Sequence, residues 1–319
     1  MAIERVAVVG AGEWGTALAQ AAASAGRHVT LIGRDPEVLA EINVAHTNRK
    51  HLGMQRLSTR ISASPRFSGA DLVILAVPAQ STRAALTALH NLGEPVVLTA
   101  KGLEHGTLKR QSEILAEVAP NAVPFVLSGP SFAVDVAAGR PTAVTLAGEY
   151  DNETEAVAAA LAGPSFRLYA ARDIIGVELA GALKNVYALA AGAVEGASLG
   201  ASARAGLIAR AYAELGRLVV ALGGNPDTMG GLAGLGDLTL SCTSTQSRNY
   251  RHGVALGKGE LPERELAEGV LTAPVVRELA QRAGVEAPLI EAVNLLLEGN
   301  VKIDKIVAGL MSRPLKRET

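Results

Sequence analysis

Apolar residues in the first half of the chain recur as short continuous runs, separated by stretches in which they have helical spacing. Runs that are apolar on both faces are typical of strands buried in a parallel sheet. They occur at RVAVVG (5–10), HVTLIG (28–33), ADLVILAVP (70–78), PVVLTAKG (95–102), FVLSG (125–129), AVTLAG (143–148) and FRLYA (166–170). Buried strands that alternate with helices predict an α/β fold with a doubly wound parallel sheet.

The intervening stretches carry helix signals. TALAQAAASAG (16–26) is rich in alanine and ends at Gly26, and DPEVLAEIN (35–43) opens with Asp35 as N-cap and Pro36 at the first helical position. Further helices are predicted in STRAALTALHNL (81–92), FAVDVAAG (132–139) and NETEAVAAALAG (152–163).

The pattern changes near residue 175, where strand signals nearly vanish and helical spacing becomes long. Long helices are predicted in 177–197, 204–223 and 272–284, with a glycine-rich segment, GGLAGLGD (230–237), between helices. We therefore predict two domains, an α/β domain of residues 1–178 and an all-α domain of residues 179–319.

Composition and charge narrow the class of protein. Of the 319 residues, 49% are hydrophobic and only 3% aromatic, so the core must consist of Ala, Val and Leu. A net charge of −1 offers no bulk attraction to nucleic acid or to an anionic membrane, and we expect neither as a partner. Polar residues, glycine or proline interrupt each apolar run, so no stable membrane insertion is expected.

The cysteine count and the N-terminus favour a cytoplasmic protein. Cys242 is the single cysteine, which excludes an intrachain disulfide and fits a reducing compartment. A catalytic thiol is a minor alternative, because no activating base lies nearby in the sequence. Glu4 and Arg5 precede the first strand, so the N-terminus does not read as a signal peptide.

The segment VVGAGEWGTALA (8–19) contains a G-x-G-x-x-G pattern at Gly10, Gly12 and Gly15, between a buried strand and an Ala-rich helix. There the first glycine permits a tight turn, the second lets a pyrophosphate approach the backbone, and the third allows close helix packing. The helix N-terminus also offers free N–H groups to the phosphates. We predict a dinucleotide site; a turn without a ligand is the alternative. Trp14, the only tryptophan, either lines this site or packs beneath the loop.

The end of the second strand, LIGRD (31–35), bears on the choice of cofactor. An acidic residue there accepts a hydrogen bond from the ribose in NAD-binding proteins. Here Arg34 can hold a 2′-phosphate, while Asp35 is committed to capping the next helix. The sequence favours NADP without excluding NAD, and a solvated surface charge is the alternative for Arg34.

Polar residues follow two predicted strands at their carboxyl ends, where parallel sheets bind ligands. Lys101 follows VVLTA, and Ser128-Gly129-Pro130-Ser131 follows FVL, with small residues that expose backbone N–H groups. For both segments, a polar loop without a ligand is the alternative.

Lys184 lies in the predicted helix 177–197 without an acidic residue three or four positions away, so it lacks a helical ion pair. Its neighbours at those spacings are Ala180, Gly181, Tyr187 and Ala188. Desolvation among them lowers the pKa of a lysine and suits it to proton transfer. A lysine that extends into solvent is the alternative.

A last polar group lies at 237–249. Asp237 follows the glycine-rich segment, and Ser247, Arg248 and Asn249 stand in a row. A guanidinium between two neutral hydrogen-bonding side chains suits a small phosphate ester, with a plain polar loop as the alternative. No His, Cys and Asp cluster has ligand spacing, so no metal is expected.

Together these residues resemble a known family. The motifs GAGEWGTALA, LAVPAQ, AKGLE, SGPSFA, LKN, GLAGLGDL and SRN are similar, in order and approximate spacing, to those of the NAD(P)-dependent glycerol-3-phosphate dehydrogenases, the bacterial biosynthetic type most of all. The resemblance implies a Rossmann-type domain, a helical substrate-binding domain and a site in the cleft between them. It implies reversible NAD(P)H-dependent reduction of dihydroxyacetone phosphate to sn-glycerol 3-phosphate, a phospholipid precursor.

The resemblance also implies residue roles. Lys184 would be the catalytic acid/base, with Lys101 and Asp237 beside it. Besides the three glycines, the cofactor site would include Glu13, Trp14, Arg34, Lys101, Ala133, Arg248, Leu266 and Glu268. The substrate would contact Lys101, Gly129, Ser131, Lys184, Asp237, Ser247, Arg248 and Asn249. A homodimer is expected because it is the commonest oligomer of soluble enzymes.

The chain departs from the family pattern at three places: Ala100 replaces a usual threonine, HLGM (His51, Leu52, Gly53, Met54) replaces a typical Tyr-Leu-Pro-Gly, and Ser202 replaces a common asparagine. Two rival functions stay open. Another hydroxyacid or sugar-acid dehydrogenase would share the glycine loop and a lysine, but does not call for SRN and GLGD together. A nucleotide sensor without catalysis has no need for Lys101, Lys184 and Asp237.

Overall fold

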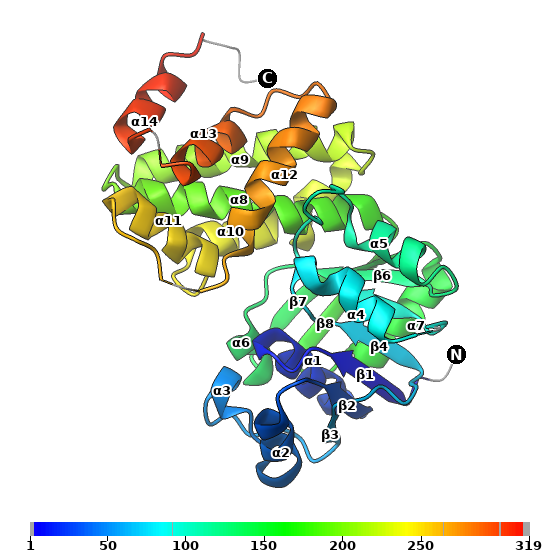
Figure 1. The fold of residues 1–319 in the computed structure, drawn as a ribbon. Coiled ribbons are helices and arrows are strands. Elements are labelled where there is room, and N and C mark those ends of the chain that lie inside the picture. Colours follow the sequence, from blue (N-terminus) through cyan, green and yellow to red (C-terminus); the bar gives the residue numbers. More distant parts are fainter. Residues whose placement is uncertain (1–2, 91, 264, 300, 315–319) are drawn as a thin grey trace.

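The computed structural model describes residues 3–90, 92–263, 265–299 and 301–314. They form a sheet with helices on its two faces and, above it in Figure 1, a bundle of helices. The sheet contains β1 (Arg5–Val9), β2 (His28–Ile32), β3 (Ile61–Ser64), β4 (Leu72–Leu75), β5 (Val96–Leu98), β6 (Pro124–Ser128), β7 (Thr142–Gly148) and β8 (Phe166–Ala171).

The strand order is β3-β2-β1-β4-β5-β6-β7-β8, and the chain reverses direction across the sheet between β1 and β4. Alternate residues of β1 pack on opposite faces: Val6 and Val8 join one apolar cluster, and Ala7 and Val9 join the other. Because both faces are covered, the strands read as continuous apolar runs. This confirms the predicted doubly wound α/β fold.

Two details of the sheet differ from the prediction. β3, with the short sequence ISAS, carries too weak an apolar signal to be recognised. β7 runs antiparallel to β6, and β8 is parallel to β7, so the sheet is not wholly parallel. The connection between β6 and β7 holds only the five-residue helix α6 (Ala133–Ala137), which packs against α1 instead of crossing the sheet.

The helices of the sheet part follow the predicted segments, with two additions. The predicted ones are α1 (Glu13–Ser24), α2 (Pro36–Ala45), α4 (Thr82–Ala88), α6 and α7 (Asp151–Leu161). The additions are α3 (Arg49–Leu52) and α5 (Gln111–Val118). Asp35 caps α2 as expected, since its carboxylate accepts from the N–H groups of Glu37 and Val38.

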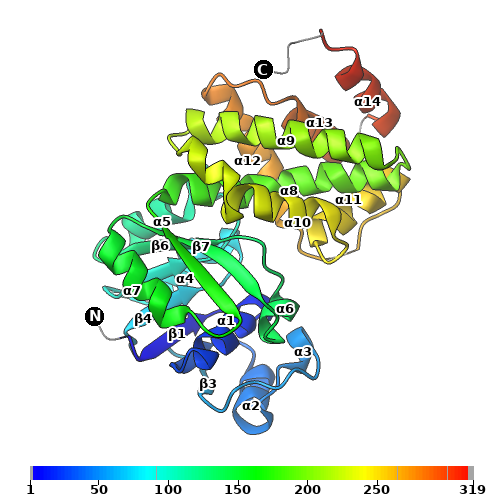
Figure 2. The same ribbon diagram turned by 180° about the vertical axis from the view of Figure 1, so that it is seen from behind.

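The helical part is built around α8 (Ile174–Gly196), which Figure 2 shows running alongside α9 (Ala201–Ala221), below it in the view. Its other elements are the 3₁₀ turn η2 (Pro226–Gly230), the π-helical turn η3 (Leu232–Gly236), α10 (Asp237–Thr243), α11 (Arg248–Lys258), α12 (Glu268–Arg282), α13 (Pro288–Leu297) and α14 (Ile303–Met311). By length and composition α8 could cross a membrane, but 89% of its most apolar window is buried inside the protein. α8 is therefore the core helix of this part.

Glycines bring α8 and α11 into backbone contact. A Cβ atom at Gly192 would lie 2.1 Å from the carbonyl oxygen of Tyr250, and one at Gly253 would lie 2.1 Å from that of Leu189. Only hydrogen fits at these two positions. The close approach places the start of α11, with SRN, beside the middle of α8, with Lys184.

The chain passes from the sheet to the helical part between Ala171, the last residue of β8, and Ile174, the first of α8. Asp173 fixes this passage, because its carboxylate accepts from Gly176 N–H, Asn225 N–H and the hydroxyl of Thr228. Residue 178, the predicted division, lies inside α8.

Candidate active site

The glycine-rich turn has the geometry of a phosphate-binding loop. Gly10 has φ +113°, and a Cβ atom there would lie 2.5 Å from the carbonyl oxygen of Ala76. A Cβ atom at Gly15 would lie 1.8 Å from the oxygen of Gly10, so both positions require glycine for the protein's own packing. A Cβ atom at Gly12 would meet no protein atom within 4 Å, and Gly12 faces a cavity at the N-terminus of α1. Open space at this glycine fits the approach of a dinucleotide pyrophosphate.

The cavity, with a volume of about 440 Å³, lies between the sheet part and the helical part. Its walls come from the glycine turn, the ends of β4 and β5, α6, α8, and the starts of α11 and α12. Of the residues predicted for the site, it is lined by Gly12, Glu13, Trp14, Lys101, Ser131, Ala133, Lys184, Ser247, Arg248, Asn249, Leu266 and Glu268. Gly10, Gly15, Arg34, Gly129 and Asp237 do not line it.

Two lysines share one carboxylate beside the cavity. Nζ of Lys101 lies 2.6 Å from Oδ2 of Asp237, and Nζ of Lys184 lies 2.7 Å from its Oδ1. Lys184 also donates to Oγ of Ser241 at 2.6 Å, and Lys101 donates to the carbonyl oxygen of Gly129 at 3.1 Å. The cluster brings together the end of β5, α8 and the first residue of α10, and both lysines reach the cavity.

Burial controls the charge state of this cluster. The side chain of Lys184 is 9% exposed and that of Asp237 is 1% exposed. Burial lowers the pKa of Lys184 to about 8, against the opposing pull of the Asp237 charge. Burial alone would raise the pKa of Asp237, but the charges of Lys101 and Lys184 outweigh it and hold that pKa below its ordinary value. The predicted desolvation of Lys184 is confirmed, and its extension into solvent is wrong.

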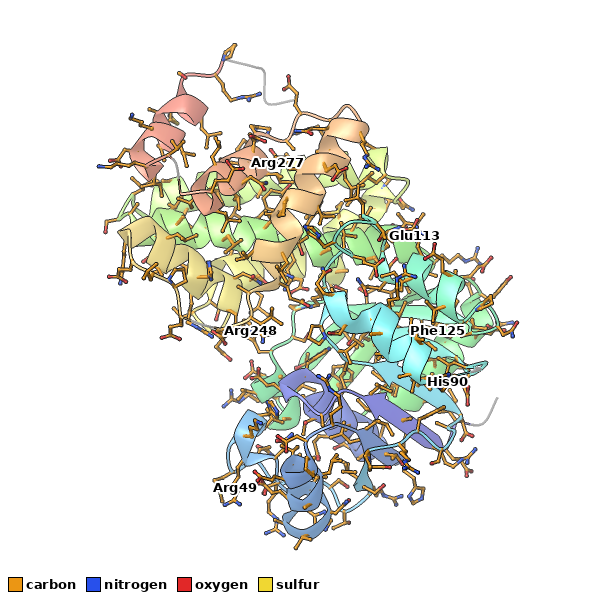
Figure 3. All side chains as sticks on the ribbon, in the orientation of Figure 1. Arg49, His90, Glu113, Phe125, Arg248 and Arg277 are labelled. Carbon is orange, nitrogen blue, oxygen red and sulfur yellow. The ribbon has the colours of Figure 1, made fainter. Side chains whose placement is uncertain are left out.

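α11 begins at the polar triplet. The hydroxyl of Ser247 accepts from Tyr250 N–H and caps the helix, so Ser247 has a structural task as well as a place on the cavity wall. Arg248 is exposed, lines the cavity and makes no hydrogen bond or ion pair within the described residues. Figure 3 labels Arg248 at the edge of the helical part that faces the sheet part. Its guanidinium is free for an anionic ligand.

Asn249 is partly used by the protein itself. Its amide N–H donates to Oδ1 of Asn185, and its carbonyl oxygen accepts from Gly269 N–H. Asn185 in turn donates to the carbonyl oxygen of Lys101 at 2.9 Å, so this chain of amides joins α11, α8 and the end of β5. One amide N–H of Asn249 is left for a ligand. Asn185 stands in the LKN motif beside Lys184, but its sequence position alone indicated no role.

Glu268 and Trp14 also line the cavity. Oε1 of Glu268 accepts from Ala79 N–H at 3.1 Å, which links α12 to the loop after β4, and burial raises the pKa of this carboxyl. Trp14 has both of its expected contacts: it lines the cavity and packs against the apolar cluster under α1.

Arg34 lies outside the cavity, just beyond the end of β2. It is exposed and makes no hydrogen bond or ion pair within the described residues, whereas Asp35 is occupied by its cap and by Lys50 at 2.7 Å. A free guanidinium beside an occupied carboxylate fits a cofactor with a 2′-phosphate better than one with a free ribose hydroxyl.

The departures from the family pattern and Cys242 can also be located in the structure. Ala100 lines the cavity, Met54 is 77% exposed, and Ser202 is exposed on the first turn of α9, away from the cavity. Cys242 is buried, and burial raises the pKa of its thiol to about 12, so it is not an activated nucleophile. Within the described ranges, no three His, Cys, Asp or Glu side chains group as they would around a metal ion.

Fold and cavity together define a dehydrogenase of the class that binds a dinucleotide on a Rossmann-type sheet. Sequence profiles narrow this class: the N-terminal region of NAD-dependent glycerol-3-phosphate dehydrogenase matches residues 5–156, and its C-terminal region matches residues 173–308. The chain belongs to the NAD-dependent glycerol-3-phosphate dehydrogenase family.

Individual relatives agree over the whole length. Glycerol-3-phosphate dehydrogenase [NAD(P)+] of Caulobacter vibrioides is 51% identical over 100% of both chains, and that of Brucella canis is 49% identical over 98% of this chain and 99% of its own. The crystal structure of glycerol-3-phosphate dehydrogenase from Coxiella burnetii superposes with a TM-score of 0.91 at 35% identity, covering 98% of this chain and 99% of its own.

Proposed function

We propose that this protein catalyses the reversible NAD(P)H-dependent reduction of dihydroxyacetone phosphate to sn-glycerol 3-phosphate, with NADPH as the preferred donor. The observation that carries the proposal is the Lys101–Asp237–Lys184 cluster on a cavity that also contains the glycine turn and a free Arg248. The names of the curated relatives support the same reaction.

The cofactor, when bound, supplies the hydride to the carbonyl carbon. Gly12 and the N-terminus of α1 would bind its pyrophosphate, and Arg34 the 2′-phosphate. Glu13, Trp14, Ala133, Leu266 and Glu268 would complete the cofactor wall.

Substrate positioning would fall to groups on the opposite wall. Arg248, with Asn249 and Ser247, would hold the phosphate, which leaves the ketone end near the two lysines. Ser131, whose hydroxyl donates to the oxygen of Gly129, would contact the substrate from the β6 side.

Lys184 would act as the acid. With a pKa of about 8 it is mostly an ammonium ion at neutral pH, yet close enough to neutrality to release a proton readily. It would stabilise the charge that develops on the carbonyl oxygen and then protonate that oxygen from Nζ. Lys101 would add a second positive charge, and Asp237 would hold both ammonium groups in place.

One assay tests this reaction against its rivals. NADPH oxidation should be rapid with dihydroxyacetone phosphate and slow with dihydroxyacetone, which lacks the phosphate that Arg248 would bind. Equal rates with the two ketones would favour another hydroxyacid dehydrogenase, and no oxidation together with NADPH binding would favour a sensor.

Four further features stay predictions: the division at residue 178, a homodimer, a cytoplasmic location and a role in phospholipid synthesis.

A further inference from the structure

A buried amide lies directly beneath the glycine-rich turn. Asn48, the residue before α3, is fully buried, and its Nδ2 donates to the carbonyl oxygen of Ala11 at 3.1 Å and to Oγ1 of Thr16 at 2.8 Å. Asn48 does not line the cavity, and no sequence motif marked it. Figure 1 shows α3 near α1, and the two helices are in contact.

Thr16 links the Asn48 amide to a second carbonyl group of the turn. Its hydroxyl donates to the carbonyl oxygen of Gly12 at 2.7 Å, and the hydroxyl itself is buried. Two successive carbonyl groups of the turn, those of Ala11 and Gly12, therefore accept from side chains, and the Gly12 carbonyl also accepts from Thr16 N–H at 3.0 Å. Both hydrogens of the Asn48 amide serve this purpose, while its Oδ1 has no hydrogen-bond partner in the described part of the chain.

Because the peptide bond is planar, a hydrogen bond that fixes a carbonyl group of the turn also sets the direction of the next N–H group. In a planar trans peptide the C=O and the following N–H point in opposite directions. Holding the Ala11 carbonyl toward Asn48 turns the N–H of Gly12 the other way, and holding the Gly12 carbonyl does the same for the N–H of Glu13. Gly12 and Glu13 both line the cavity, and Glu13 is the first residue of α1, where N–H groups are free for phosphate.

We propose that Asn48 is a positioning residue for the cofactor: with Thr16 it fixes two peptides of the glycine turn so that their N–H groups face the pyrophosphate. This inference rests on the proposed function, because it presupposes a bound dinucleotide. An asparagine is required, since an aspartate of the same shape would set an acceptor against the Ala11 oxygen. A donor held in place before binding raises affinity, because the loop has no freedom to lose.

The test compares four variants by NADPH titration, by KM for dihydroxyacetone phosphate at saturating NADPH, and by Tm. Asn48→Ala and Thr16→Val remove the support, whereas Thr16→Ser retains the hydroxyl. We expect the first two to raise the Kd for NADPH about tenfold, the equivalent of about 1.4 kcal/mol. KM and kcat at saturation should change by less than about twofold, because the lost bonds act on cofactor binding. Thr16→Ser should bind NADPH like the parent.

Asn43→Ala is the matched control. Asn43, on α2, exchanges two hydrogen bonds with the backbone of Ala63, at 3.0 and 2.7 Å, and does not touch the cavity. Its loss should lower Tm without changing the Kd for NADPH. An unchanged Kd in Thr16→Val or in folded Asn48→Ala would overturn the inference, as would an equal rise in Asn43→Ala. A parent protein that does not bind NADPH would instead overturn the proposed function, and this inference with it.

Discussion

Nζ of Lys184 lies 2.7 Å from Oδ1 of Asp237, although 53 residues separate the two in the chain. The contact joins the buried middle of α8 to the first residue of α10, directly after the π-helical turn η3. π-Helical turns are frequent at functional sites. The ion pair keeps a desolvated lysine charged at neutral pH, and this charge state sets the direction of proton transfer.

The pH dependence should therefore have opposite signs in the two directions. Reduction needs Lys184 as an ammonium ion, so kcat/KM for ketone reduction should fall as the pH rises through about 8, the pKa that burial gives this lysine in the free enzyme. Oxidation of glycerol 3-phosphate needs the neutral amine, so its kcat/KM should rise through the same range. Steady-state profiles in both directions check this. Two profiles of the same sign would exclude Lys184 as the titrating group.

Arg248→Ala should mainly weaken substrate binding. The guanidinium makes no hydrogen bond or ion pair within the described residues, so its removal breaks none, although the buried Glu268 carboxyl loses a nearby positive charge. We expect KM for dihydroxyacetone phosphate to rise by about 10- to 100-fold, the scale of a hydrogen bond to a charged group. Arg282→Ala, which removes an exposed arginine paired with Glu278 on α12, is the charge-matched control and should leave KM unchanged. A normal KM in Arg248→Ala would refute the phosphate contact.

We expect the choice between NADPH and NADH to depend on Arg34. Because Asp35 is engaged by the α2 cap and by Lys50, no carboxylate at the end of β2 is free for the ribose. Arg34→Ala should raise KM for NADPH about tenfold and leave KM for NADH nearly unchanged. KM for NADPH and KM for NADH should be measured on one preparation of the variant. Equal increases in the two constants would contradict a contact between Arg34 and the 2′-phosphate.

The contact between α8 and α11 predicts a stability effect. Gly253→Ala would press a methyl group against the Leu189 carbonyl, so the free energy of unfolding should fall by about 1–3 kcal/mol. At Gly206, on α9, a Cβ atom would meet nothing within 4 Å, and Gly206→Ala should stabilise by about 0.5–1 kcal/mol. Urea unfolding of both variants tests the pair. A similar shift in both would show that the helices do not meet as described.

The fold could be predicted from the sequence where a strand or helix is marked by its own residues. Apolar runs marked the strands except β3, and Asp35 and Pro36 marked the start of α2. The reversal of β7 was missed because strand direction depends on how the connecting chain packs, which a strand's own residues do not encode.

The site residues, too, could be predicted only where their neighbours in the sequence carried the signal. Lys184 stood out because its helical neighbours offered no partner, and Asp237 proved to be that partner from a distant helix. Asn48 was not marked by any motif, and Asn185, although part of the LKN motif, was assigned no role, since an asparagine becomes informative only through the groups it reaches in space. Ser241, which accepts from Lys184, was hidden for the same reason.

Whether Lys184 supplies the proton in the reduction of dihydroxyacetone phosphate can be decided with the variant Lys184→Ala. The measurement is kcat with saturating NADPH and dihydroxyacetone phosphate, alongside the Kd for NADPH of the same preparation. We expect a loss of about 10²- to 10⁴-fold in kcat with the Kd for NADPH nearly unchanged. Near-normal turnover in this variant would contradict it.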